Sequence, residues 1–428
     1  MLQLLERTYI SVFRRYPMLL RMALVVLLAE IVFAVVNNYA LTLYIWHDLG
    51  QPMHVACDII AVFLGAEMLL KFPAGHLSDR YGRRRFAAIG LAVCIGTPLA
   101  VCVIPPRLIA YPAAPLLLYL LLGPLRFTDG AGSAALWPPL FASVPDHVDR
   151  RHRGVAMSVM NTAYLAGLAL GPALAGGAMK LSTAAGHPEW SGRSPFALVV
   201  LLALLASWVA WALPAQQTHG EESRPGGALP PLRVIAVILV ITFSDMFATA
   251  TLAPIIPPYL IQMFGVEKSN VGLLMLLLMI PAGILGMPIG HLTDRWDRRR
   301  VVLAALCITA AGLWGVSLAQ TLPQALGAGA LVMLGFMFGL PAWLSLITEL
   351  APEAGYGKVM GVMAAAQGAG AFAGPPVAGR LWGLSPHYPF YLAASMLTLS
   401  SLVALIFVQR GRGARAEVAM GSEAARGL

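Results

Sequence analysis

Long apolar stretches separated by short polar segments set the pattern of this chain of 428 residues. A predominantly apolar helix of about 18 or more residues can cross roughly 30 Å of hydrocarbon, and such runs recur along the whole length. Hydrophobic residues make up 58% of the chain and charged residues 11%, a balance foreign to a soluble domain of this size. The pattern predicts an all-α membrane protein with about twelve transmembrane helices. The expected spans are 19–45, 55–74, 86–104, 115–144, 154–180, 195–213, 232–262, 271–289, 301–319, 324–350, 357–383 and 387–409.

A charged segment occurs twice, each time between two of these spans. Gly75–Arg85 returns as Gly290–Arg300, and subtracting 75 from 290 gives an offset of 215. At the same offset Glu30 falls on Asp245. Two related membrane halves are typical of alternating-access transporters. The expected organisation is an N-terminal six-helix half at 1–213, a cytoplasmic linker at 214–231, a C-terminal six-helix half at 232–409 and a cytoplasmic tail at 410–428.

The distribution of arginine and lysine predicts the orientation. With the N-terminus placed in the cytoplasm, the loops and flanks of that side collect 22 positive side chains and those of the other side collect five. Both termini are therefore expected in the cytoplasm, and the first 18 residues show no cleavable signal. We expect a multi-pass, monomeric protein of a bacterial inner membrane. Its net charge of +9 follows from topology and attraction to anionic lipid, so nucleic acid is not an expected partner.

Short motifs within this plan resemble those of a known family. The loop after the second span matches Gly-x-x-x-Asp-Arg-x-Gly-Arg-Arg, the fourth span carries Arg-x-x-x-Gly-x-Gly from Arg126, and the fifth contains Gly167, Gly171 and Pro172. The chain resembles the major facilitator superfamily over nearly its whole length, and within it the twelve-helix proton-coupled drug and metabolite antiporters. Two departures are Asp129, where a neutral amide is commoner, and Ala175 before Gly176, where two glycines are preferred.

The resemblance implies a conformational latch in the two charged hairpins. Asp79 would accept hydrogen bonds at the start of the eleventh helix near Gly357, and Asp294 would do the same at the fifth helix near Gly154. A carboxylate at a helix N-terminus is favoured by about 0.3–1 kcal/mol. The alternative is that the arginines only fix topology. The residues of the expected latch are Gly75, Asp79, Arg80, Gly82 and Arg83 in the first copy, and Gly290, Asp294, Arg295 and Arg298 in the second.

Ionisable residues inside the spans are the candidates for the transport chemistry, because a charge in hydrocarbon costs roughly 2.5–3.5 kcal/mol. Glu30 lies near the middle of the first span, and by the fold analogy it would face a central cavity together with Asp245. Each carboxylate could carry a proton, or it could be held by a neighbour as part of the packing. The residues expected to form a proton and substrate cavity are Glu30, Asp245, Arg126, Asp129, Asn37, Asn38 and Tyr164.

Two further pairs of charges lie on single helices. Arg126 and Asp129 are three residues apart and therefore within reach of each other. They would form either a switchable ion pair or a fixed buried one. Glu67 and Lys71 are four residues apart, and for them the structural interpretation is the favoured one.

Small residues in the fifth and eleventh spans predict close helix packing and a kink. By the fold analogy they form a rigid hinge that prevents leakage, and the alternative is ordinary small-residue packing. The expected hinge residues are Gly167, Gly171, Pro172, Gly176, Gly374 and Pro375.

The charges also narrow the expected function. Four acidic residues and two basic ones lie within the spans, which disfavours an anion carrier. We expect a secondary active transporter that couples export of a cationic or neutral amphipathic molecule to protons. The alternatives are an importer or exporter of a metabolite, metal or chelated metal, and a non-transporting scaffold or sensor. No nucleophile constellation, nucleotide-binding loop or metal-ligand spacing is present, so neither an enzyme nor a cofactor is expected.

Overall fold

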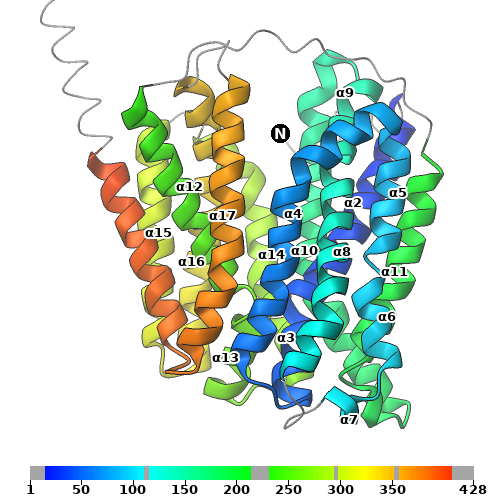
Figure 1. Cartoon of the computed structure of the whole chain (residues 1–428). Helices are drawn as coiled ribbons and strands as arrows, with labels where there is room; N and C mark the ends of the chain where they lie inside the picture. The colour runs from blue at the N-terminus through cyan, green and yellow to red at the C-terminus, as the bar shows by residue number, and fades with distance from the viewer. Residues whose placement is uncertain (1–14, 110–114, 214–230, 294–296, 351–355, 407–428) are drawn as a thin grey trace, which may run out of the picture. The chain divides into compact units, whose positions relative to one another are not determined.

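The chain is helical throughout the residues that its computed structural model describes, which are 15–109, 115–213, 231–293, 297–350 and 356–406, and this part contains no strand (Figure 1). The described residues fall into two compact units. The first unit comprises Met1–Glu222, Ala250–Gly283 and Ala371–Pro386, and the second comprises Ser223–Thr249, Ile284–Gly370 and His387–Leu428. The first unit therefore combines the whole N-terminal repeat with two segments of the C-terminal repeat.

The N-terminal repeat begins with one continuous helical stretch and continues through ten further elements. The first stretch consists of α2 (Pro17–Val35), the π-helix η1 (Val36–Ala40), α3 (Leu41–Leu43) and the π-helix η2 (Tyr44–Asp48). The elements that follow are α4 (Met53–Tyr81), α5 (Arg83–Val93), α6 (Gly96–Val103), α7 (Pro106–Ile109), α8 (Pro115–Ala142), α9 (Val144–His147), η3 (Arg150–His152), α10 (Arg153–Ala184), η4 (Pro188–Trp190) and α11 (Ser194–Trp211).

The C-terminal repeat follows the same plan. Its helices are α12 (Leu232–Leu252), α13 (Ile256–Phe264), α14 (Lys268–Thr293), α15 (Arg298–Leu318), α16 (Leu322–Leu350), α17 (Tyr356–Trp382) and the helix Tyr388–Ile406. Within the described residues, eight helical stretches are long and apolar enough to cross a membrane, with Pro17–Asp48 and Arg83–Val103 counted as one stretch each. A ninth is added if the pair Ile256–Phe264 and Lys268–Ile280, bent by 116°, counts as one span. With the long helices α4, α8 and α17, the predicted all-α fold of twelve spans in two halves is confirmed.

Two of the predicted spans are broken where the sequence expected continuous helices. The span 86–104 ends as α5 at Val93 and restarts as α6 at Gly96. The span 232–262 is divided into α12 and α13 by Ala253–Ile255. Proline explains the second break, because Pro254, Pro257 and Pro258 lack the N–H groups that would continue the hydrogen-bond ladder of α12.

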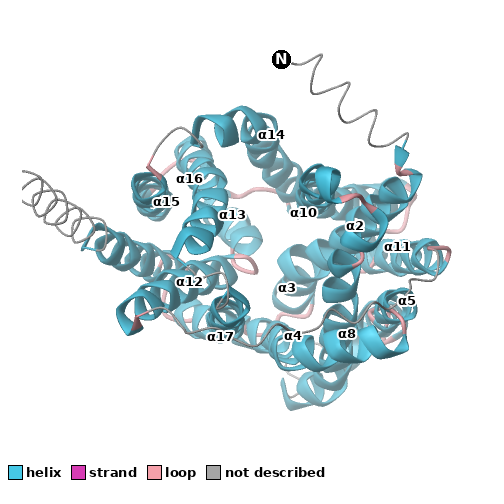
Figure 2. Ribbon diagram, turned by 90° about the horizontal axis from the view of Figure 1, so that it is seen from above, coloured by secondary structure: helices cyan, strands magenta, loops and turns pink. Residues whose placement is uncertain are grey.

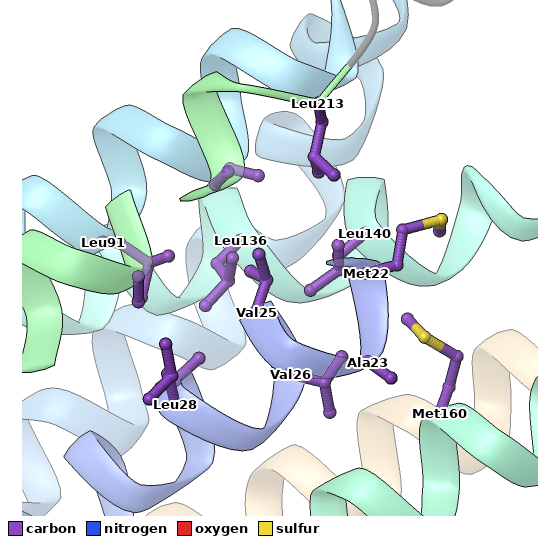
Figure 3. Packing of buried hydrophobic residues seen from close by; sticks show 14 of the residues in the cluster. Met22, Ala23, Val25, Val26, Leu28, Leu91, Leu136, Leu140, Met160 and Leu213 are labelled. Atoms are coloured by element: carbon purple, nitrogen blue, oxygen red, sulfur yellow. The ribbon is translucent and has the colours of Figure 1, made fainter. Parts of the chain in front are cut away.

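Helix α2 lies at the centre of the N-terminal repeat, where it packs against α10 and α11. Figure 3 shows the apolar cluster at one end of it, where Val25 and Leu28 face Leu91 of α5 and Leu136 of α8. Because lipid tails are as apolar as these side chains, close packing rather than exclusion from water holds such helices together. Figure 2, viewed from above, shows α2, α5, α8, α10 and α11 grouped around this core.

Glycines allow two helix pairs, α2 with α10 and α12 with α17, to pack in close contact. A Cβ atom on Gly167 of α10 would stand 2.7 Å from the Glu30 Cβ of α2, and one on Gly171 would stand 2.7 Å from the Ala34 Cβ. The C-terminal repeat shows the equivalent arrangement, since a Cβ on Gly370 of α17 would stand 2.6 Å from the Phe243 carbonyl oxygen of α12. Both contacts are closer than a side chain permits, so the duplicated plan includes the packing of its helices.

Candidate functional site

Glu30 is a buried carboxylic acid in the middle of α2. Its side chain is 5% exposed, and it lies where α2 meets α10, directly opposite Gly167. The hydroxyl of Tyr164, one turn before Gly167 on α10, lies against the Glu30 carboxyl group. The missing side chain of Gly167 thus makes the space in which the acid and the tyrosine meet.

A second acid lies in the electrostatic neighbourhood of Glu30. Glu67 of α4 is its one acidic neighbour among the described residues, and the Glu67 carboxylate accepts a hydrogen bond of 2.8 Å from Lys71. The Lys71 side chain is about half-exposed, whereas Glu67 is largely covered. The Glu67–Lys71 pair predicted from the spacing is confirmed.

Arg126 is the largest fully buried side chain in the described part of the protein. Its guanidinium donates a hydrogen bond of 3.2 Å to Asp129, donates another to the Asn37 side-chain oxygen on η1, and lies 4.4 Å from the centre of the Phe63 ring. Its Nε has no hydrogen-bond partner among the described residues. Stacking on an aromatic face is a favourable position for a desolvated guanidinium.

Asp129 is held by Arg126 through one carboxylate oxygen. The other oxygen has no hydrogen-bond partner among the described residues and lies beside the first residues of α6, where a Cβ on Gly96 would stand 3.5 Å from it. A helix N-terminus favours a carboxylate, and this N-terminus exists only because the third span is broken at Cys94-Ile95. Cys94 also donates to the backbone carbonyl of Asp129 at 3.3 Å. The surroundings are those of a fixed ion pair, which favours the structural interpretation of Asp129.

An aromatic wall, defined as Phe63, Phe33, Trp137 and Tyr164, connects Arg126 to Glu30. The ring centres are 5.8 Å apart between Phe63 and Phe33, 5.8 Å between Phe33 and Trp137, and 5.5 Å between Trp137 and Tyr164. Sequence reasoning found Tyr164 but missed the other three, since aromatic residues from three helices show no periodicity along one chain. The wall joins a permanent cation at one end to a carboxylic acid at the other.

Asp245, the repeat mate of Glu30, lies on α12 in the second unit. Its side chain is half-buried, and within the described residues it has no hydrogen-bond or ion-pair partner. Phe243 and Phe247 flank it and stack with ring centres 5.7 Å apart. Asn38 is likewise half-buried and without a hydrogen bond in the described part of the chain, in contrast to Asn37.

The first hairpin forms a network of charges. Arg83 donates to Asp79 at 2.9 Å, to Asp146 at 2.7 Å and to the Ala142 carbonyl at 2.6 Å, which ties α4 to the end of α8. Gly82, between α4 and α5, has a φ of 102°, a conformation that favours glycine. Arg80 lies over the Tyr81 ring, and Gly75 lies within α4. Within its own unit Asp79 is thus paired with Arg83, and its docking near Gly357 stays a prediction.

The second hairpin is described only in part. Asp294 and Arg295 lie outside the described residues, and Gly290 falls within the last turns of α14. Arg298 donates to the Ser345 carbonyl of α16 at 3.5 Å, and Asp297 caps α15 by accepting from the Arg299 N–H at 3.0 Å.

The small residues expected to form a hinge lie at helix contacts. Gly167 and Gly171 face α2, while Pro172 and Gly176 face Gly272 and Ser269 of α14, where Cβ atoms on Gly176 and Gly272 would overlap the opposite backbone. Gly374 and Pro375 are buried in α17. The close packing is present, and its role as a hinge stays a prediction.

The comparisons with known proteins agree with this architecture. The family model described as Major Facilitator Superfamily matches residues 22–237 and 238–426. The chain belongs to this superfamily, and it is a multi-pass integral membrane protein.

Among its relatives, the chain is 28% identical to the "Tetracycline resistance protein, class G" of Vibrio anguillarum over 42% of this chain and 46% of that protein. The chain thus spans about half the length of the first curated relatives that it matches. It is 21% identical to "Multidrug resistance protein 2" of Bacillus subtilis (strain 168), over 84% of this chain and 87% of that protein.

A solved structure confirms the fold. The crystal structure of a D-xylose-proton symporter is similar with a TM-score of 0.71 and 16% identity, and the match covers 90% of this chain and 96% of the other.

Proposed function

We propose that the protein couples the export of a cationic or neutral amphipathic small molecule to proton movement. The observation that carries the proposal is the buried Glu30 carboxyl group, placed in the middle of α2 against Tyr164 and at the end of the aromatic wall. An isolated charge costs several kcal/mol in hydrocarbon, so this acid can alternate between a neutral protonated form and a charged form that binds a cation. Protons and cargo then compete for one group.

The aromatic wall supports the class of cargo. The half-buried rings of Trp137 and Tyr164 offer apolar area to an amphipathic molecule and electron-rich faces to a cationic one, whereas Phe33 and Phe63 are buried behind them in the core. Arg126 already occupies the face of Phe63, and Asp129 together with Asn37 holds it there. We assign to Arg126 and Asp129 the fixed end of the site and to Glu30 the end that changes charge. Asp245 would supply a second acid from the other repeat, and Asn38 a polar contact.

The relatives support export as the direction. Tetracycline and multidrug resistance proteins are named for resistance to compounds, and removal of a compound from the cell is one way to resist it. In the proposed orientation both termini and the Arg83 hairpin face the cytoplasm of a bacterial inner membrane, in accordance with the positive-inside rule. We further propose that the protein works as a monomer, and that Asp79 and Asp294 form cytoplasmic latches in the outward-open state.

The test is cargo-dependent proton flux in proteoliposomes with an imposed pH gradient and an internal pH dye. The panel comprises lipophilic cations, neutral drugs and divalent metals, and Glu30→Gln and Asp245→Asn are compared with wild type. Glu189→Gln is the matched control, because Glu189 is an exposed carboxylate that pairs only with His187 among the described residues. We expect flux with an amphipathic compound that is lost in Glu30→Gln and kept in Glu189→Gln.

Two results would contradict the proposal. If flux is unchanged in both Glu30→Gln and Asp245→Asn, neither carboxyl group carries the coupled proton. Binding of a compound without any flux across the whole panel would favour a sensor or scaffold on the same fold.

A further inference from the structure

Charged residues gather at the end of the helices opposite the Arg83 hairpin, where α4 begins and α17 ends. Arg380 of α17 donates from Nη1 to Asp58 Oδ1 at 2.8 Å and from Nη2 to Asp58 Oδ2 at 3.3 Å. The Tyr119 hydroxyl of α8 donates to the same Oδ2 at 3.0 Å. Both oxygens of this carboxylate are therefore occupied by donors from two other helices, and the paired geometry is the strong one for arginine.

A second ion pair lies at the same end and joins the N-terminal repeat to α14. Lys268 donates to Asp48 Oδ1 at 3.0 Å, and the Tyr39 hydroxyl donates to the backbone carbonyl of Lys268. The His47 ring nitrogen is 2.8 Å from the same Asp48 oxygen. Gly192 borders the other oxygen of Asp48, and the space for that carboxylate exists because Gly192 has no side chain.

The backbones around these pairs are in direct contact. A Cβ on Gly379 would stand 2.6 Å from the Cα of His54 and 2.9 Å from the Cβ of Cys57, and one on Gly65 would stand 2.9 Å from the Phe372 ring. Trp46 and Trp382 meet edge to face with ring centres 6.0 Å apart. All these contacts lie within the first unit, and each joins the N-terminal repeat to a segment of the C-terminal repeat.

The charged residues at this end have no charged counterparts at the equivalent positions of the other repeat. At the offset of 215, Asp58 corresponds to Leu273, Asp48 to Met263 and Lys268 to Met53. Glu30 and the hairpin arginines, in contrast, keep their charge in both copies. Since the common plan does not place acids and bases here, their pairing belongs to the contact between the repeats.

We propose that Asp58–Arg380 and Asp48–Lys268 are the two ion pairs of an outer gate, which must separate each time the cavity opens to the side opposite the hairpins. This inference rests on the proposed transport function, in which the cavity opens in turn to each side of the membrane. Tyr119 and Tyr39 are positioning residues, because Tyr119 orients the Asp58 carboxylate and Tyr39 fixes the backbone of Lys268. When the gate opens, all four charges can hydrate, so the closed state is favoured by a modest amount.

The first test measures the opening of this end directly. Spin labels are placed on Ala185→Cys and Leu384→Cys, two exposed positions beyond the ends of α10 and α17, in a background in which the four native cysteines are replaced. Distance distributions are recorded in nanodiscs without cargo and without a pH gradient. We expect Asp58→Asn, Arg380→Gln and Lys268→Gln each to raise the open-to-closed ratio about fivefold relative to the same labelled background.

The charge-exchanged variant decides whether the ion pair itself is responsible. Asp58→Arg combined with Arg380→Asp should bring the ratio back toward the parent value, whereas either change alone should raise it. Glu189→Gln is again the matched control, since its carboxylate lies at the same end without joining the repeats. A ratio that stays unchanged in Asp58→Asn, Arg380→Gln and Lys268→Gln overturns the gate, as does a charge exchange that fails to restore the ratio after the single changes have raised it.

The outcome is independent of the proton-coupling proposal. If the distances shift as expected while Glu30→Gln keeps full cargo-dependent proton flux, the outer gate is supported and the proposed role of Glu30 is contradicted. If the distances do not shift while Glu30→Gln abolishes flux, the reverse conclusion holds.

Discussion

Glu30 and Asp245 occupy equivalent positions in the two repeats, yet their surroundings differ. Glu30 is 5% exposed and lies against Tyr164, whereas Asp245 is half-buried and has no polar partner among the described residues. The helix packing is the same in both cases, because Gly167 faces the turn of Glu30 and Gly370 faces Phe243 and Phe247, on either side of Asp245. The duplication has kept the backbone frame and the acid, while the side chains around each acid have changed separately.

The largest expected effect comes from removing the acid on each side. Glu30→Gln should lower cargo-dependent proton flux about 100-fold, since roughly 2.5–3.5 kcal/mol separates a charged from a neutral group in hydrocarbon. Asp245→Asn should lower it about tenfold, because a half-buried carboxylate is easier to replace by a neutral side chain. Proteoliposome flux measures both. Equal losses of flux in the two variants would mean that the different surroundings of Glu30 and Asp245 do not affect transport.

The packing beneath the acids gives the next effect. Gly167→Ala places a methyl group 2.7 Å from the Glu30 Cβ and should lower the free energy of unfolding by about 1–3 kcal/mol. Gly370→Ala should do the same in the other repeat. Gly177→Ala is the control on α10, since no atom lies within 4 Å of its added Cβ. Thermal unfolding in detergent is the measurement, and a Gly167→Ala variant as stable as Gly177→Ala would contradict the close contact.

The tyrosine hydroxyl sharpens the difference further. Tyr164→Phe removes the group that lies against Glu30 and should lower proton flux about fivefold, the effect of one ordinary hydrogen bond of about 1 kcal/mol. Ser158→Ala is the control on the same helix, because the Ser158 hydroxyl donates only to the Gly154 carbonyl at 3.0 Å. Full flux in Tyr164→Phe would mean that Glu30 needs no polar partner, just as Asp245 has none among the described residues.

The smallest effect is expected at Asp149, where a tyrosine hydroxyl again lies against a carboxyl group, but at a solvent-exposed position. The Tyr16 hydroxyl donates to Asp149 at 2.6 Å, and this hydrogen bond, helped by the Arg15 charge, lowers the pKa of the exposed Asp149 carboxyl group. A lowered folded-state pKa stabilises the fold above the unfolded value of about 3.9, and this contribution is lost as the pH falls through the folded pKa.

Tyr16→Phe should therefore lower the melting temperature slightly at pH 7 and leave it unchanged near pH 2. Melting curves at the two pH values test this. Phenylalanine keeps the ring, so an equal loss at both would assign the effect to the other contact of the hydroxyl, which lies 3.3 Å from His152 Nδ1.

The parts of the architecture that could be predicted from the sequence are those encoded locally or by repetition. The spans follow from apolar runs, the two halves from the repeated hairpin, and the Arg126–Asp129 contact from a spacing of three residues. The break before α6 had a signal that was overlooked, because Gly96 and Pro98 follow it and Pro98 lacks the N–H that would bond the Cys94 carbonyl.

The aromatic wall and the pairs at Asp58 and Asp48 were missed for a different reason. Arg380 and Asp58 are 322 positions apart, and no offset of the repeat relates them. Such contacts depend on how two helices cross, and a single sequence does not encode the crossing in a pattern that can be counted.

The make-up of the first unit also sets an order of assembly during synthesis. Asp58 leaves the ribosome 322 residues before Arg380, and the glycines of α4 follow it shortly afterwards. At about 5–20 residues per second, that interval lasts roughly 15–60 s. For this time the nascent N-terminal repeat holds an acid without its base, and a small-residue surface without the helix that covers it. The last contacts of the unit can form only after α17 has entered the membrane, so its completion reports that nearly the whole chain has been made.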